Sequence, residues 1–169
     1  RFRPAAVKVK QAVAAGALGK LAHCSVAVPW WRPQAGYYDQ PGRGTLARDG
    51  GGVLITQAIH TLDLFLHLAG PVTQVHALAA TSPVHRMETE DQVVATLGFA
   101  NGAMGALDCT TVAYPGYPET ILLAGDKGSA RIAGTEAAIE YMGPPPRRET
   151  AGSASGGGGG ADPMAFPHD

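Results

Sequence analysis

The sequence of 169 residues lacks the features that define several classes of protein. It has two cysteines, Cys24 and Cys109, which lie far apart and form no C-x-x-C pair, so neither a disulfide framework nor a zinc site is expected. A formal net charge of −1 provides no attraction for nucleic acid or for an anionic membrane. The chain has no run of about 18 apolar residues and no apolar N-terminal stretch. These absences favour a soluble, cytoplasmic protein that binds neither nucleic acid nor membranes.

The composition that remains is typical of a folded domain. Hydrophobic residues make up 45% of the chain, which is enough to bury the core of one domain. We place this domain at residues 1–150. The segment that follows, GSASGGGGGADP, has too little apolar surface to offset its chain entropy. Residues 151–169 are therefore expected to form a flexible, Gly-rich tail.

Two helices are predicted in the first half of the domain. Pro4 stands at a plausible first helical position, and a surface helix is expected from there to Gly16. A strand, LAHCSVAVPWW, and an irregular loop rich in glycine and proline follow. The second helix is expected within residues 49–70.

The second half of the domain is predicted to consist almost entirely of strands. Asn101-Gly102 separates two β-rich runs, and this pair favours a tight hairpin because both residues tolerate positive φ. Asp126-Lys127-Gly128 predicts a second hairpin, and AAIEYM a further strand. Runs of strands beside two helices predict an α+β domain, with a predominantly antiparallel open sheet and helices on one face.

The second predicted helix combines a broad apolar side with a narrow polar stripe. On a wheel of about 100° per residue, an apolar arc is expected to face the sheet, and its members are Leu54, Ile55, Ala58, Ile59, Leu62, Phe65, Leu66 and Ala69. The stripe beside it holds Thr56, His60, Asp63 and His67. It is interpreted as a solvated face with a weak ion pair, as a metal site that lacks a further His or Cys to complete it, or as a place where His60 acts as a general acid or base.

Two glycine-rich patterns precede this helix. GRGTLA, residues 42–47, formally matches the dinucleotide-binding fingerprint, but Pro41 and the polar segment before it do not form a buried strand. No nucleotide site is therefore predicted there. The glycines at 50–52 either cradle a phosphate at the helix N-terminus or give a tight entry to the helix, with Asp49 as N-cap or dipole partner. We favour the second interpretation.

The loop before the helix concentrates side chains that suit a sugar. Flat aromatic faces on which a sugar ring can stack come from Trp30, Trp31, Tyr37 and Tyr38, although ordinary packing explains any one of them. Arg32 and Arg43 are suited to a carboxylate or phosphate on the substrate. As a cluster beside the histidine helix, these side chains favour a pocket. The other histidines singled out, His23, His76 and His85, have no recognisable companions in the sequence.

Three stretches carry a resemblance to a known family. They are RFRPAAVKVKQAVAAGALGKL, WWRPQAGYYDQPGRGTLARDGGGVLITQAIHTLDLFLHLAGPVTQV and ILLAGDKGSARI. Together they resemble the C-terminal substrate-binding domain of the glucose-fructose oxidoreductase, inositol dehydrogenase and rhizopine-catabolism family over most of residues 1–150. The most specific part is the pattern DGGG-x-L-x-x-Q-x-I-H-x-x-D.

The resemblance implies an NAD(P)-dependent oxidoreductase that acts on a sugar, an inositol or a related polyol. It places a contact with the substrate hydroxyl, and possible proton transfer, on His60. Gln57 matches a glutamine of many members, and Asp63 also matches, with a more structural interpretation. Thr56 stands where members usually carry aspartate or asparagine, so it offers a hydroxyl but no carboxylate. The open sheet of the family commonly mediates oligomerisation, which implies a homo-oligomer.

The chain also departs from the family pattern. Members bind NAD or NADP in an N-terminal Rossmann domain that carries a catalytic lysine in a Glu-Lys-Pro motif, and neither that motif nor the nucleotide fingerprint occurs in this sequence. The chain alone is therefore expected to bind no cofactor and to be inactive, because hydride transfer requires the nicotinamide to be held against the substrate. The alternative is a non-catalytic binding or assembly module that retains the fold without the chemistry.

Overall fold

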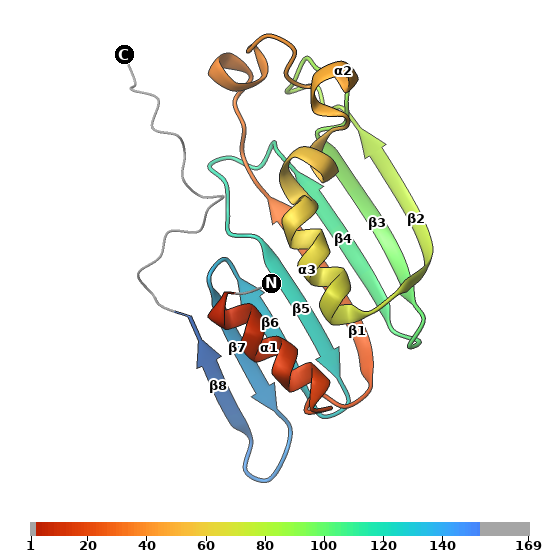
Figure 1. The fold of residues 1–169 in the computed structure, drawn as a ribbon, viewed down its shortest axis with the longest axis vertical. Coiled ribbons are helices and arrows are strands. Elements are labelled where there is room, and N and C mark those ends of the chain that lie inside the picture. The colour runs from red at the N-terminus through yellow and green to blue at the C-terminus, as the bar shows by residue number, and fades with distance from the viewer. Residues whose placement is uncertain (1–2, 153–169) are drawn as a thin grey trace.

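The computed structural model describes residues 3–152, and it consists of one large sheet with helices on one side (Figure 1). Of the predicted flexible tail, residues 151–169, the structure describes Ala151, which ends the last strand, and Gly152; the rest lies outside the described residues. Eight strands form the sheet in the order β2-β3-β4-β1-β5-β6-β7-β8. The strands are β1 (Leu21–Pro29), β2 (Val72–Ala80), β3 (Gln92–Phe99), β4 (Met104–Thr110), β5 (Thr120–Gly125), β6 (Gly128–Ala133), β7 (Glu136–Tyr141) and β8 (Arg147–Ala151).

The sheet is predominantly antiparallel, as predicted. Its one parallel pair among the described strands joins β1 to β4 in the middle of the sheet, with Cys24 opposite Gly105 and Val28 opposite Cys109. Both predicted hairpins are confirmed, because β3 pairs with β4 and β5 pairs with β6 in antiparallel register. The outermost strand β8 has no counterpart in the sequence prediction.

Helix α1 (Pro4–Ala14) lies over the half of the sheet that ends in β8 (Figure 1). Pro4 occupies the first turn, as expected from its fixed φ and missing N–H. The helix buries small side chains, Ala5, Ala6, Val9 and Ala12, so that it lies close against β6 and β7.

The second predicted helix is observed as one helical segment over residues 53–69, and a separate short helix precedes it. A short helix α2 (Leu46–Asp49) ends at Gly50, whose φ of 73° is left-handed. A wide helical turn η2 (Leu54–Ala58) follows and leads into α3 (Ile59–Ala69). Gly52 lies between α2 and η2 and packs against the residues that precede β3. A Cβ added to Gly52 would lie 1.9 Å from the carbonyl oxygen of Glu90. The glycines therefore serve a close backbone approach at this point.

The helical wheel was partly wrong about which side of this helix is buried. Phe65, Leu68 and Ala69 are buried on the sheet together with Thr61, whereas three members of the predicted apolar arc are exposed: Ile55 by 52%, Ile59 by 42% and Leu66 by 46%. Two physical causes explain the shift. The π-type bonding of η2 adds a residue to its turn and displaces the wheel, and the apolar arc is wider than the strip that one helix can bury against a sheet.

The stretch Leu46–Ala69 is long and apolar enough to cross a membrane when only length and composition are considered. This qualifies the expectation from the sequence that no such run exists. In the structure the stretch is interrupted at Gly50 and packs on the sheet, where the Phe65 ring meets the Phe99 ring edge-on at 5.8 Å. Its apolar character is thus explained by packing as a core helix.

The two faces of the sheet differ in exposure. The face under α1 and α3 is buried and forms the main core, which includes Val26, Leu97, Ile121, Leu123 and Ile139. On the opposite face, Leu78, Val94 and Met104 are exposed by 76%, 50% and 70%. The prediction of an α+β domain with an open sheet and helices on one face is therefore confirmed.

Candidate functional site

The predicted site residues gather at one end of the sheet, beside the start of the histidine helix. There β1 ends at Pro29, β4 ends at Thr110 and β3 begins at Gln92, so three loops meet above the strand ends (Figure 1). Trp30 and Trp31 continue directly from β1. A β-bridge from Trp31 to Val112 holds the loop that follows β1 against the loop that follows β4. This arrangement places the aromatic loop next to η2.

A chain of hydrogen bonds joins this loop to the helix. Gln57, which is 8% exposed, accepts a hydrogen bond from Arg32 Nε at 3.1 Å and donates from Nε2 to the Tyr37 hydroxyl at 2.6 Å. Arg43 donates from Nη1 to the same hydroxyl at 3.1 Å. Tyr37 therefore connects two predicted substrate contacts, Gln57 and Arg43, and the Gln57 amide also holds Arg32.

Both arginines are stacked on aromatic rings. The Arg32 guanidinium lies 5.3 Å from the centroids of the Trp30 and Tyr37 rings, and that of Arg43 lies 4.4 Å from the Tyr37 ring. Within residues 3–152, neither guanidinium forms an ion pair with a carboxylate. An arginine carries five N–H donors, so each retains donors beyond those used in the network. Among the described residues, the site thus holds two guanidinium groups with no carboxylate at ion-pair distance.

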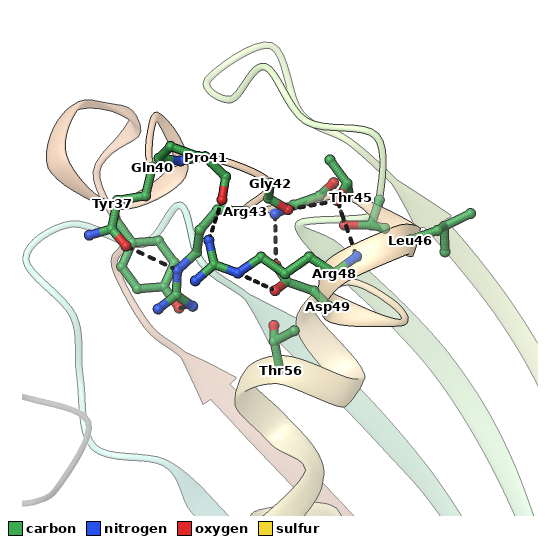
Figure 2. A network of polar contacts seen from close by, with 12 residues as sticks. Tyr37, Gln40, Pro41, Gly42, Arg43, Thr45, Leu46, Arg48, Asp49 and Thr56 are labelled. Carbon is green, nitrogen blue, oxygen red and sulfur yellow. Dashed lines mark hydrogen bonds and ion pairs between the residues drawn. The ribbon is translucent and has the colours of Figure 1, made fainter.

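The loop behind Arg43 is held by Arg48 and Asp49 (Figure 2). Asp49 accepts the Gly44 N–H at 2.7 Å, and Arg48 donates to the carbonyl oxygen of Pro41. Of the two roles expected for Asp49, N-cap or dipole partner of the following helix, the N-cap role was wrong, because its carboxylate accepts from the loop and that helix begins without a side-chain cap. Its role is to fix the loop that presents Arg43.

Thr56 and His60 occupy successive turns of the helical segment. Thr56 is directed toward the loop of Arg48 and Asp49 (Figure 2), and its hydroxyl donates to the carbonyl oxygen of Gly52 at 2.9 Å. His60 is exposed, as are Asp63 and His67, so the polar stripe is on the outer side of the helix. Among the described residues, no group of three His, Cys, Asp or Glu side chains is placed to hold a metal ion.

His60 lines a cavity of about 200 Å³ between the start of α1, the start of α3, the beginning of β5 and the end of β6. Arg3, Thr61 and Glu119 contribute the other polar walls, and apolar side chains complete it. Glu119 Oε2 is buried and has no hydrogen-bond partner among the described residues. The cavity wall thus combines the exposed imidazole of His60 with the carboxyl group of Glu119.

Tyr38 differs from its neighbour Tyr37. Its ring meets that of Tyr37 edge-on at 4.9 Å, and its hydroxyl pairs with Thr111 Oγ1 at 2.9 Å in the interior. Burial raises the pKa of Tyr38 from 10.0 to about 12. Tyr38 is therefore a neutral residue in the wall of the site, and its hydroxyl is bonded to Thr111 in the interior.

Comparison with known proteins identifies the family. Residues 6–131 match the model of the GFO/IDH/MocA C-terminal domain. The chain belongs to the GFO/IDH/MocA family. The resemblance inferred from the DGGG pattern of the helix is thereby confirmed.

Dehydrogenases are among the proteins of known structure that the chain resembles. The WlbA dehydrogenase from Bordetella pertussis, solved in complex with NADH and UDP-GlcNAcA, is 38% identical, with a TM-score of 0.71 over 79% of this chain and 40% of that one. An uncharacterised oxidoreductase of Bacillus subtilis, YrbE, is 30% identical over 77% of this chain and 37% of its own length. A levoglucosan dehydrogenase, complexed with NADH and levoglucosan, is 21% identical, covers 89% of this chain and 44% of that one with a TM-score of 0.77, and shows the shared fold. The chain thus spans about two fifths of the length of the first relatives it matches.

Several members of this candidate site were missed in the sequence. His85 was expected to have no companion, yet it is buried and paired with Asp91 at 2.7 Å. Arg3 and Glu119 reach the cavity of His60 from distant parts of the chain. The available signal was positional, because Asp91 immediately precedes a strand and His85 lies six residues earlier in the same loop. No local pattern links Glu119 to His60.

Proposed function

We propose that this chain is the substrate-binding domain of a nicotinamide-dependent oxidoreductase that acts on a sugar, an inositol or a related polyol. The observation that carries the proposal is the Arg32–Gln57–Tyr37–Arg43 network. It fixes hydrogen-bond donors and aromatic faces beside the ends of β1 and β4. Aromatic faces stack on sugar rings, and fixed donors orient hydroxyls. Family membership and the dehydrogenase relatives support the same class of reaction.

Within this proposal His60 positions the reacting hydroxyl and shares its proton. It is accessible and lies one turn beyond Thr56, at the cavity that Glu119 also lines. An imidazole accepts or donates a proton near neutral pH. Thr56 contributes a hydroxyl to the same side of the helix but no charge.

The substrate carries an anionic group, on the evidence of the two arginines. Arg32 and Arg43 lack an acid partner in residues 3–152, and unpaired guanidinium groups match a carboxylate or a phosphate. The relative from Bordetella pertussis binds UDP-GlcNAcA, which bears both groups. A sugar acid or a nucleotide-linked sugar is therefore preferred to a neutral polyol.

The cofactor is NAD or NADP, supplied in the full-length protein by a separate nucleotide-binding domain. When bound, it provides the hydride acceptor or donor, and the chain described here binds and orients the substrate. We place the protein in the cytoplasm as a homo-oligomer joined through the open sheet face. The second candidate is a binding module without catalysis, which the replacement of the family carboxylate by Thr56 favours.

Titration of the ¹⁵N-labelled chain with UDP-GlcNAcA, glucuronate, glucose and myo-inositol tests the binding proposal. The indole signals of Trp30 and Trp31 and the side-chain amide of Gln57 should shift with the two anionic sugars at lower concentration than with the neutral ones. NADH should leave all signals unchanged. Equal responses to all four sugars would remove the anionic preference. Shifts confined to residues far from the loop would contradict the site.

A further inference from the structure

The imidazole of His85 is enclosed between two loops of the site. Its side chain and that of Asp91 are both 0% exposed. Nδ1 lies 2.7 Å from Asp91 Oδ2, and Nε2 lies 2.8 Å from the main-chain carbonyl oxygen of Arg32. The ring also lies 4.6 Å from the Tyr38 ring and 6.1 Å from the Trp31 ring, centroid to centroid. His85 therefore joins the loop that precedes β3 to the loop that carries the aromatic wall.

Both hydrogen-bond partners of this ring are acceptors. A carbonyl oxygen such as that of Arg32 has no hydrogen to donate, so Nε2 must carry the proton. Asp91 already accepts the Ser82 N–H at 2.8 Å through Oδ1 and the Ser82 hydroxyl at 2.6 Å through Oδ2. The hydroxyl oxygen of Ser82 in turn accepts the Val84 N–H at 3.2 Å, which leaves its own hydrogen for Asp91. The carboxylate is thus organised as an acceptor, and Nδ1 must also donate.

We infer that His85 is a buried imidazolium, paired with the Asp91 carboxylate, and that it is a positioning residue for Arg32. A neutral imidazole has one donor nitrogen and satisfies only one of these two bonds. A charge in the interior requires a partner of opposite sign with its remaining lone pairs satisfied. Asp91 meets that requirement with two bonds from Ser82, while Tyr38, the titratable ring stacked nearby, remains neutral.

The pair acts on the site through the main chain of Arg32. The carbonyl held by His85 belongs to the residue whose guanidinium is stacked on Trp30 and Tyr37 and whose Nε reaches Gln57. Loss of the anchor frees the backbone from which this side chain is aimed. The consequence for substrate binding rests on the proposed function, whereas the protonation of His85 and the position of Arg32 do not.

Substitution Asp91→Asn separates the charge from the anchor. The carboxamide has nearly the same shape, but its amide group presents a donor to Nδ1, so the ring becomes neutral and keeps only the Nε2 proton for the Arg32 carbonyl. His85→Phe removes both donors while leaving a flat ring beside Tyr38. The two variants are therefore expected to differ. Asp91→Asn should change the charge of the His85 ring and leave Arg32 in place, whereas His85→Phe should release Arg32.

The ring nitrogens are measured directly by long-range ¹H–¹⁵N NMR of the ¹⁵N-histidine-labelled chain at neutral pH, with the exposed His23 and His76 as internal references. Both nitrogens of His85 should resonate as protonated, and in Asp91→Asn the Nδ1 signal should move to the unprotonated position. A wild-type Nδ1 that is already unprotonated overturns the inference, and so does a spectrum that Asp91→Asn leaves unchanged.

The position of Arg32 is followed by the Nε–H signal of its side chain. That signal should be protected from solvent exchange in the wild-type chain and in Asp91→Asn, and at least about tenfold less protected in His85→Phe. Protection that stays the same in a folded His85→Phe variant shows that Arg32 is held without His85 and overturns the positioning role. If His85→Phe does not fold, the comparison of Arg32 protection is made with His85→Gln, whose side-chain amide can donate to the carbonyl but carries no charge. In that variant protection is expected to be retained in part, and complete retention or complete loss contradicts the role assigned to the Nε2 bond.

Discussion

Gln57 donates to the Tyr37 hydroxyl at 2.6 Å and accepts from Arg32 Nε at 3.1 Å, so one amide of the helix holds two residues of the loop. This relationship makes the loop and the helix a single unit. Hydrogen bonds within the protein itself hold the aromatic faces and the guanidinium groups of the loop in place, which is a form of preorganisation. Such preorganisation reduces the ordering cost of binding.

Gln57→Ala should destabilise the domain because it leaves the Tyr37 hydroxyl and Arg32 Nε without these partners. Buried groups left unsatisfied cost about 1–3 kcal/mol, and that loss in the free energy of unfolding is expected in urea denaturation. Gln40→Ala provides the matched control, since Gln40 is exposed. A Gln57 variant as stable as the control would show that the network contributes nothing to folding.

Phe65→Ala should destabilise the domain far more than Leu66→Ala. Phe65 is fully buried against Phe99, and removal of such a ring costs about 3–5 kcal/mol. Leu66 is 46% exposed, so its truncation should change stability by less than about 1 kcal/mol. Thermal unfolding of the two variants checks the observed phase of α3 directly, because the helical wheel alone assigns both residues to the core.

Phe65 and Leu66 also show which features of the fold can be predicted from the sequence and which cannot. Strand patterns, the Asn101-Gly102 turn and the family pattern were sufficient for the fold class and for the loop that bears the site, because these signals are local. The exposure of Leu66 was not predictable, since it depends on the width of the contact with the sheet and on the wide turn η2. His85 was missed for the same reason: its partners Asp91 and Arg32 meet it only after the loops have folded over the strand ends.

The buried thiols should make stability fall at alkaline pH. Burial raises the pKa of Cys24 from 9.0 to about 11 and that of Cys109 from 9.0 to about 12. Each thiol therefore stays protonated in the folded state at a pH where it ionises in the unfolded state. The unfolded state binds fewer protons between pH about 9 and 11, so the free energy of unfolding decreases as the pH rises through this window.

Thiol labelling measures the same burial. At pH about 8 the native chain should react with iodoacetamide much more slowly than the chain unfolded in urea, because only the accessible thiolate reacts. Rapid labelling of either cysteine under native conditions would contradict the burial of both strands β1 and β4. A Cys24→Ser variant reports the reactivity of Cys109 alone.

The open face of the sheet is expected to form the contact between subunits. Leu78, Val94 and Met104 are exposed on neighbouring strands of that face, and an apolar patch of several hundred Å² usually marks an interface. Light scattering at a concentration of about 100 μM should show a dimer or larger assembly. The double variant Leu78→Lys with Met104→Lys should shift the population to monomer, whereas Leu46→Lys, at an exposed position away from the sheet face, should not. A wild-type monomer would remove the proposal of a sheet interface.

The most direct test of the proposed function compares His60→Ala with His67→Ala in the full-length protein, assayed with NAD or NADP and a sugar substrate. Both side chains are exposed on the same stripe, but only His60 lines the cavity with Glu119. General acid or base groups contribute about 10²–10⁴-fold to rate. His60→Ala should therefore lower kcat/KM by at least about tenfold and leave Tm within a few degrees, while His67→Ala retains nearly full activity. Equal, small effects of the two substitutions on kcat/KM would show that the stripe is a solvated face and would contradict the account of this site.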